Sequence, residues 1–100
     1  MILYNVTVNI DPGVEKEWIK WMKEVHIPEV MATGIFHENK LFKLLHMEED
    51  GGVNYSVQYF TDSIEKIHEY QEKYANALQE DFKQKFKDRY VIFRSLLQQV

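Results

Sequence analysis

The chain has 100 residues, of which 45% are hydrophobic and 14% aromatic, and its formal net charge is −4 at pH 7. This composition is typical of one globular domain over residues 1–100 and argues against a disordered chain. Cations and acids are mixed along the sequence, so nucleic acid is not expected as a partner. The absence of cysteine excludes a disulfide framework, a thiolate nucleophile and the usual structural zinc site.

The N-terminal segment is not expected to be a signal peptide. It lacks the basic region and the long apolar run of a signal peptide, and no stretch of the sequence approaches the length that crosses a bilayer. We therefore expect a cytoplasmic protein without a membrane partner. Two Trp, six Tyr and six Phe are more large rings than one small core encloses, which predicts a homodimer.

Residues 2–10 alternate between apolar and polar side chains and predict a strand with one apolar face. The other face holds Asn5 and Thr7, which are polar but uncharged. A helix follows, with Asp11 as its N-cap and Pro12 at its first position. Its buried stripe is predicted from residues at helical spacing: Val14, Trp18, Trp21 or Met22, and Val25.

Pro28 predicts an interruption of this helix. Proline lacks the backbone N–H and biases the preceding residue, Ile27, away from the helical conformation. We expect the helix to break or kink between His26 and Pro28. One further turn, over residues 29–33, is then closed by Gly34 in the left-handed conformation.

The second half of the chain predicts two strands, a helix and a last strand. The first strand spans residues 35–48, with a bend near residues 38–40, and a hairpin turn at residues 49–52 leads to a strand over residues 53–60. The polar face of that strand includes Ser56 and Gln58. Asp62 and Glu65 fit a capping box for a helix that runs to about Lys87. The last strand, residues 90–98, contains Arg94.

The order βαββαβ predicts the ferredoxin-like α+β fold, a four-stranded antiparallel sheet with two helices on one face. The opposite face of this sheet is then bare and poor in charge. Two such faces packed together make a dimeric α+β barrel. Its interior is expected to be lined by uncharged polar residues: Asn5, Thr7, Ser56 and Gln58.

Four motifs carry a resemblance to a known family: YNVTVNID, EWIKWMKEVHIPEVMATGIF, YSVQYF and FRSLL. With them the chain resembles the bacterial DUF4286 family of the dimeric α+β barrel superfamily, which implies the fold and dimerisation rather than a reaction. More distantly, the segment from Trp18 to Phe36 resembles EthD-like proteins and small polyketide cyclases. In those proteins a histidine on the first helix faces the cavity, and the matching position here is His26.

His26 is the candidate catalytic residue. An unperturbed imidazole titrates near pH ~6.5 and can exchange a proton at cellular pH. Pro28 should also leave helix carbonyls unpaired beside it, for the imidazole or a ligand to bind. In the alternative, structural interpretation, His26 satisfies those carbonyls itself and only holds the kink.

The other candidate ligand-binding residues each have a structural alternative as well. Trp18 and Trp21 would wall the pocket, or belong to the core and the dimer interface. The polar set Asn5, Thr7, Ser56 and Gln58 would orient a carbonyl or hydroxyl of the ligand, or line a wet interface. Arg94 needs a carboxylate, either from the protein, which is the simpler expectation, or from a ligand.

No metal site and no cofactor are expected. His26 and Glu29 are too few ligands, and Pro28 disturbs their spacing. His37, His46 and His68 are expected in solvent. Haem-degrading members of the superfamily use a histidine, an asparagine and a tryptophan, whose nearest equivalents would be His68 and Asn5. The second half of the chain has no tryptophan, which argues against haem chemistry.

The sequence therefore predicts a homodimer that binds a small, partly apolar metabolite near His26. One alternative is a cofactor-free enzyme in which His26 performs acid–base chemistry on a carbonyl compound, as in a monooxygenase or cyclase. The other is a non-catalytic sensor or accessory subunit. Whether the protein is an enzyme stays open at this point.

Overall fold

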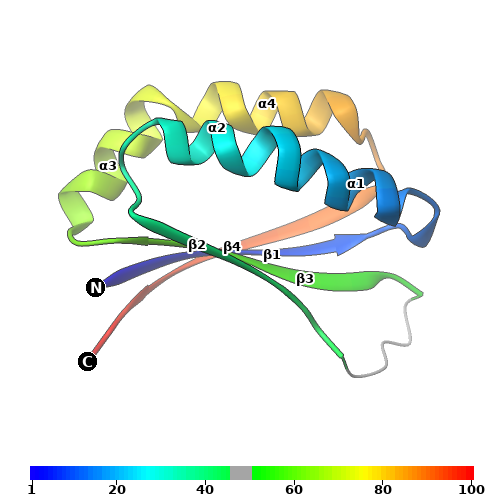
Figure 1. The fold of residues 1–100 in the computed structure, drawn as a ribbon, viewed down its shortest axis with the longest axis horizontal. Helices are drawn as coiled ribbons and strands as arrows, with labels where there is room; N and C mark the ends of the chain where they lie inside the picture. Colours follow the sequence, from blue (N-terminus) through cyan, green and yellow to red (C-terminus); the bar gives the residue numbers. More distant parts are fainter. Residues whose placement is uncertain (46–50) are drawn as a thin grey trace.

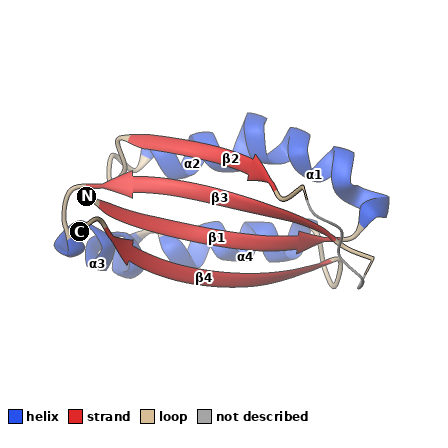
Figure 2. Ribbon diagram, turned by 90° about the horizontal axis from the view of Figure 1, so that it is seen from below, coloured by secondary structure: helices blue, strands red, loops and turns tan. Residues whose placement is uncertain are grey.

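The computed structural model describes residues 1–45 and 51–100 of the chain (Figure 1). The elements are β1 (Ile2–Ile10), α1 (Glu15–Trp21), α2 (Ile27–Ala32), β2 (Glu38–Lys43), β3 (Val53–Thr61), α3 (Ile64–Lys73), α4 (Ala75–Lys85) and β4 (Tyr90–Gln98). The strands pair antiparallel in the order β2-β3-β1-β4. All helices lie on one side of the sheet, and the view from below shows the strands uncovered (Figure 2). This arrangement confirms the predicted ferredoxin-like α+β fold.

The strand register divides the side chains between two faces, which we call inner (under the helices) and outer (bare). Val6 of β1 lies opposite both Val57 of β3 and Arg94 of β4, so these three share the inner face. Asn5 lies opposite Gln58 and Ser95 and belongs to the outer face. The core fills the space between the inner face and the helices. Its most completely buried side chains include Trp18, Ile10, Met22, Ile67, Val8, Val30 and Val57.

The predicted break before Pro28 is replaced by a wider helical turn. Residues Met22–His26 form a π turn, in which the N–H of Ile27 donates to the carbonyl of Met22, and α2 then begins with Ile27 in helical geometry (φ −61°, ψ −45°). A proline ring clashes with the carbonyl four residues before it, and a π turn relieves that clash without ending the helix. Gly34, with φ +78°, closes α2 as predicted.

The π turn also changes which side chain is buried. An extra residue in one turn rotates the helix face that follows. Consequently His26 is buried, whereas Val25, which the regular spacing placed in the core, is 39% exposed.

Several predicted boundaries in the second half are wrong. β2 is shorter than expected, because Ile35 and Phe36 are buried in the connection that precedes it. The predicted residues 46–48 of this strand, and Glu49 and Asp50 of the hairpin turn, lie outside the described residues. Ser63, not Asp62, caps α3, since its side chain accepts the N–H of Lys66. The long helix is divided at Tyr74, whose φ of −124° leaves helical geometry.

Within the described ranges, no helix combines the length and the apolar character needed to span a bilayer.

Candidate functional site

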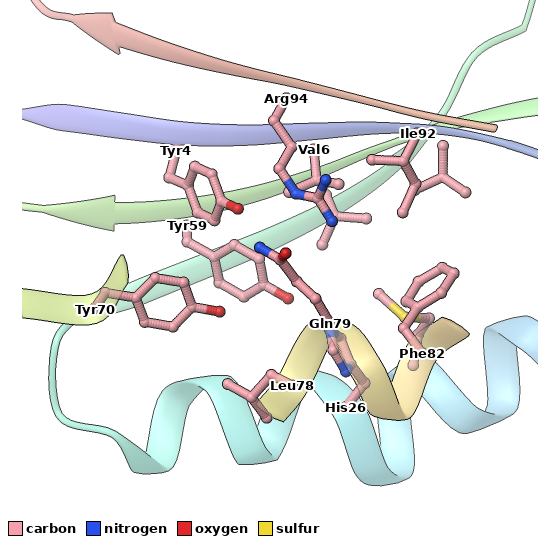
Figure 3. A pocket seen from close by; sticks show the side chains of 13 residues that line it. Tyr4, Val6, His26, Tyr59, Tyr70, Leu78, Gln79, Phe82, Ile92 and Arg94 are labelled. Carbon is pink, nitrogen blue, oxygen red and sulfur yellow. The ribbon is translucent and has the colours of Figure 1, made fainter. Parts of the chain in front are cut away.

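A small cavity lies between the inner face and the helices, near the middle of the sheet (Figure 3). Its volume is about 30 Å³, room for one or two water molecules. Its lining is mostly aliphatic and aromatic and, in the part of the chain that the structure describes, includes no aspartate or glutamate. The lining side chains are Tyr4, Val6, Val8, Met22, His26, Val57, Tyr59, Tyr70, Leu78, Gln79, Phe82, Ile92 and Arg94.

His26 reaches this cavity from the end of the π turn. Its imidazole stacks on the indole of Trp21, with ring centroids 4.9 Å apart, and meets the edge of the Phe82 ring at 5.6 Å. The residue is 9% exposed, and its Nδ1 has no hydrogen-bond partner within the described part of the chain. His26 therefore does not cap a free helix carbonyl through Nδ1, which weakens the interpretation of His26 as the residue that holds a kink.

Burial determines the protonation state of His26. Loss of hydration lowers the pKa of His26 to about 4, with a smaller lowering by the positive charge of Arg94 and a partial opposing effect of Asp81. The imidazole is thus neutral at pH 7. The expectation that His26 titrates near its ordinary value is wrong, because the side chain is enclosed by rings rather than solvated.

Tyr4, Tyr59 and Tyr70 point their hydroxyls toward the interior of the cavity (Figure 3). Burial raises the pKa of each above its ordinary value, so all three stay protonated and can donate hydrogen bonds. The hydroxyl of Tyr59 has no hydrogen-bond partner among the residues that the structure describes. The hydroxyl of Tyr4 interacts with the side chains of Arg94 and Gln79.

Arg94 enters the cavity from β4, an edge strand. In Figure 3 its guanidinium lies beside the ring of Tyr4 and above the amide of Gln79. The ion pairs found among the described residues use other cations, so the expected carboxylate partner from the protein is not found there. Its inward position on the edge of the sheet brings it near neutral phenols and an amide instead of an acidic side chain.

The polar set predicted to share the pocket with His26 lies on the other side of the sheet. Ser56 donates to Asn5 at 2.6 Å, Gln58 donates to Ser56 at 3.2 Å, and Asn5 donates to Thr7 at 3.1 Å. Asn5 also donates to Ser95 at 3.4 Å. We call these residues the outer polar network. The prediction of one site containing His26 and these residues is wrong, since the sheet itself separates them.

The two tryptophans do not line the cavity. Trp18 is fully buried in the core and packs on Tyr55, with ring centroids 4.9 Å apart. Trp21 lies behind His26, where it also contacts the edges of Phe82 and Phe86. Trp18 is therefore a core residue, as the structural alternative predicted. Trp21 affects the cavity only by supporting the imidazole of His26.

Four polar lining residues were not predicted as site residues: Tyr4, Tyr59, Tyr70 and Gln79. Alternation placed Tyr4 and Tyr59 in the core without regard to their hydroxyls. A buried tyrosine normally needs a polar partner, so tyrosine instead of phenylalanine at these positions was the available signal. Gln79 carried no comparable signal, because its position on α4 depends on how the helix packs.

Metal and haem binding gain no support from the arrangement. No group of three or more His, Cys, Asp or Glu suited to a metal occurs in residues 1–45 and 51–100. Glu29 is exposed, and His37 lies 3.4 Å from Asp62 at the surface. His68 is exposed on α3, whereas Asn5 is on the outer face, so the haem equivalents lie on opposite sides of the sheet. His46 lies outside the described residues.

Similar solved structures define the class of this fold. An EthD family protein of Bacillus halodurans superposes with a TM-score of 0.69 at 13% identity, over 100% of both chains. The Arabidopsis thaliana protein At3g17210 superposes with a TM-score of 0.71 at 15% identity, over 100% of this chain and 98% of that one. At such identities the likeness shows the fold alone.

The family follows from the sequence itself. The family model DUF4286, described as a domain of unknown function, matches residues 1–100, so the chain belongs to this family and the predicted resemblance is confirmed. A search of curated proteins finds no match.

Proposed function

We propose that the protein is a homodimer that binds a small, partly apolar metabolite in the cavity beside His26. One observation carries the ligand: Nδ1 of His26 and the hydroxyl of Tyr59 are buried at the same cavity without a partner in the described chain. Such an atom costs about 1–3 kcal/mol when it stays unpaired. A ligand with one polar group at this point recovers that cost, and the aliphatic and aromatic lining suits the rest of it.

The cavity must widen to hold such a ligand. Its volume of about 30 Å³ is far below that of usual metabolite pockets. The lining residues of α4 and β4 that keep contact with solvent are Leu78, Gln79, Ile92 and Arg94. The ligand enters by displacing these side chains, while the strands and Trp21 behind His26 stay in place.

The outer face supports the homodimer. The outward positions of β1, β3 and β4 hold no charged side chain, and their polar groups bond to one another within one protomer. In the described chain, the charges of this face are confined to the edge strand β2, where Lys40 lies 3.8 Å from Glu38. Val91 and Phe93 beside the outer polar network are 69% and 68% exposed. A second copy can cover the part of this face formed by β1, β3 and β4 without burying a charge.

The state of His26 favours binding over acid–base catalysis. A neutral imidazole donates or accepts a hydrogen bond to a carbonyl or hydroxyl, but a pKa of about 4 makes it a weak base at pH 7. The alternative of a cofactor-free, monooxygenase- or cyclase-like enzyme therefore requires a bound group that raises this pKa. A non-catalytic structural or accessory subunit needs no occupied cavity.

The ligand is tested on protein purified without additives. Small molecules released by denaturation are identified by mass spectrometry from the wild type, Tyr59→Phe and His26→Gln. We expect a stoichiometric compound from the wild type and its loss from Tyr59→Phe, a change that removes only the unpaired hydroxyl. Equal recovery from all three proteins, or none from the wild type, would contradict the proposal.

The dimer is tested by sedimentation equilibrium. Phe93→Glu places a charge on the outer face, opposite Thr7 on the edge strand β4, and is expected to give a monomer. The matched control is Ile64→Glu, because Ile64 is also an exposed apolar residue (40%) but lies at the start of α3, away from that face. A wild type that is monomeric at micromolar concentration would refute the homodimer.

A further inference from the structure

We infer that the ligand of the cavity is an organic acid whose carboxylate binds the guanidinium of Arg94, with its carbon skeleton directed toward His26. This inference rests on the proposed function and names the chemical class of the ligand. It is carried by the position and the charge environment of Arg94.

Arg94 lines the cavity at its mouth, where the residue also keeps contact with solvent. It lies opposite Val6 in the register, which directs its side chain to the inner face. Its charge acts on groups from three other elements: it lowers the pKa of His26, and it opposes the rise in the pKa of Tyr4 and Tyr70 that burial causes. A solvated arginine on the outer side of an edge strand would not reach these groups.

Arg94 forms no ion pair within residues 1–45 and 51–100, although the carboxylate of Asp81 acts on the neighbouring His26. Among the described residues Arg94 is the one formally charged side chain of the lining, since His26 is neutral and no carboxylate there lines the cavity. The whole chain has 16 acidic and 12 basic residues, so acids were available for pairing. An arginine that faces a partly closed site without a carboxylate is suited to receive one from a ligand.

The neighbouring groups fit a carboxylate. Tyr4, which already interacts with Arg94, and Gln79 supply further donors beside the guanidinium. A planar monoanion matches one guanidinium in a bidentate pair, whereas a phosphate dianion needs more positive charge than this lining holds. Beyond Arg94 the lining becomes aliphatic and aromatic, including Leu78, Phe82 and Ile92. It therefore accepts the apolar part of the acid.

The unpaired polar atoms of Tyr59 and His26, at the end of the cavity away from Arg94, would fix the orientation of the bound acid. With the carboxylate at the mouth, a hydroxyl or keto oxygen on the skeleton can meet Tyr59 and His26, which have no partner in the described chain. Plain fatty and aromatic acids then match only the carboxylate position at Arg94 and the apolar lining. Hydroxy or keto acids also match the unpaired atoms of Tyr59 and His26.

The experiment compares acids with neutral isosteres. Hexanoate, 3-oxohexanoate, benzoate and phenylacetate, and the amide of each, are titrated at millimolar concentration into the ¹⁵N-labelled protein. Binding is followed by the indole N–H of Trp21 and the side chain of Arg94. We expect at least one acid to bind about tenfold or more tightly than its amide, the size of effect usual for a charge-assisted pair.

Two variants locate the charge that is responsible. Arg94→Gln should abolish the preference for the acid, and Arg94→Lys should retain part of it. Lys87→Gln is the matched control, because Lys87 is an exposed cation outside the cavity and its loss changes the net charge equally.

The outcomes separate this inference from the proposed function. Acid and amide binding equally, or an acid preference that survives Arg94→Gln, would overturn the inference and leave a metabolite pocket in place. Inorganic phosphate competing better than every acid would also overturn it. If neither acids nor amides bind, the inference and the proposed pocket both fail.

Discussion

The polar side chains on the two sides of the sheet differ in whether they have hydrogen-bond partners. On the outer face, Asn5, Ser56 and Gln58 satisfy one another by hydrogen bonds within the protomer. On the inner side, Tyr59 of the sheet and His26 of the π turn packed against it hold buried polar atoms without partners in the described chain. A surface whose polar groups bond to one another is suited to packing against protein. Buried polar atoms without partners are suited to hydrogen bonds with a ligand. The contrast assigns the proposed dimer to one face and the proposed ligand to the other.

The largest expected difference between the two sides of the sheet is in the free energy of unfolding that is lost when a large apolar side chain is removed. Trp18→Ala should lower the free energy of unfolding by about 3–5 kcal/mol, because it empties a fully buried site. Phe93→Ala should cost the protomer less than about 1 kcal/mol, since Phe93 is 68% exposed on the outer face. Urea denaturation at low protein concentration measures both. Similar losses in the two variants would contradict this division of the core.

The next effect concerns pH and the inner face. The folded-state pKa of His26 is about 4, below its ordinary value of 6.5, so the unfolded chain binds a proton first as the pH falls. This contribution to stability is complete above pH 6.5 and is lost between pH 6.5 and pH 4, by up to about 3 kcal/mol. His26→Leu should flatten that part of the stability profile. An unchanged slope in the variant would show that His26 is not held neutral by burial.

The smallest expected effect is a change in the free energy of unfolding that is opposite in sign for hydroxyls on the two sides of the sheet. In ligand-free protein, Tyr59→Phe removes an unpaired hydroxyl and should raise the free energy of unfolding by about 1 kcal/mol. Ser56→Ala removes a hydroxyl that both donates and accepts on the outer face, and should lower it by about 1 kcal/mol. Thermal denaturation of the two variants decides the point. Destabilisation by both would mean that Tyr59 has a partner after all.

The sequence predicted the strands well because their alternation is a direct consequence of having two faces. β1 and β4 begin and end where the pattern placed them. The family and the outer polar set were also recognisable from sequence motifs. The helices were less predictable, because the π turn before Pro28 changes the period of the pattern and exchanges Val25 for His26 in the core.

The cavity was only partly predictable. His26 and Arg94 stood out by residue type, and both line it. The sequence did not show that the sheet separates them from Asn5, since alternation gives the face of each strand residue but not the helix packed above it. The roles of Tyr70 and Gln79 depend on the division of the long helix at Tyr74, which is a result of tertiary packing.

The most direct test of the division between the faces is a map of backbone amide shifts in the ¹⁵N-labelled protein when the bound compound, or the tightest acid, is added. We expect the changes to cluster around His26, Tyr59 and Arg94, while Asn5 and Ser56 stay unchanged. Changes centred on Asn5 and Ser56 instead would place the ligand on the outer face and contradict the account.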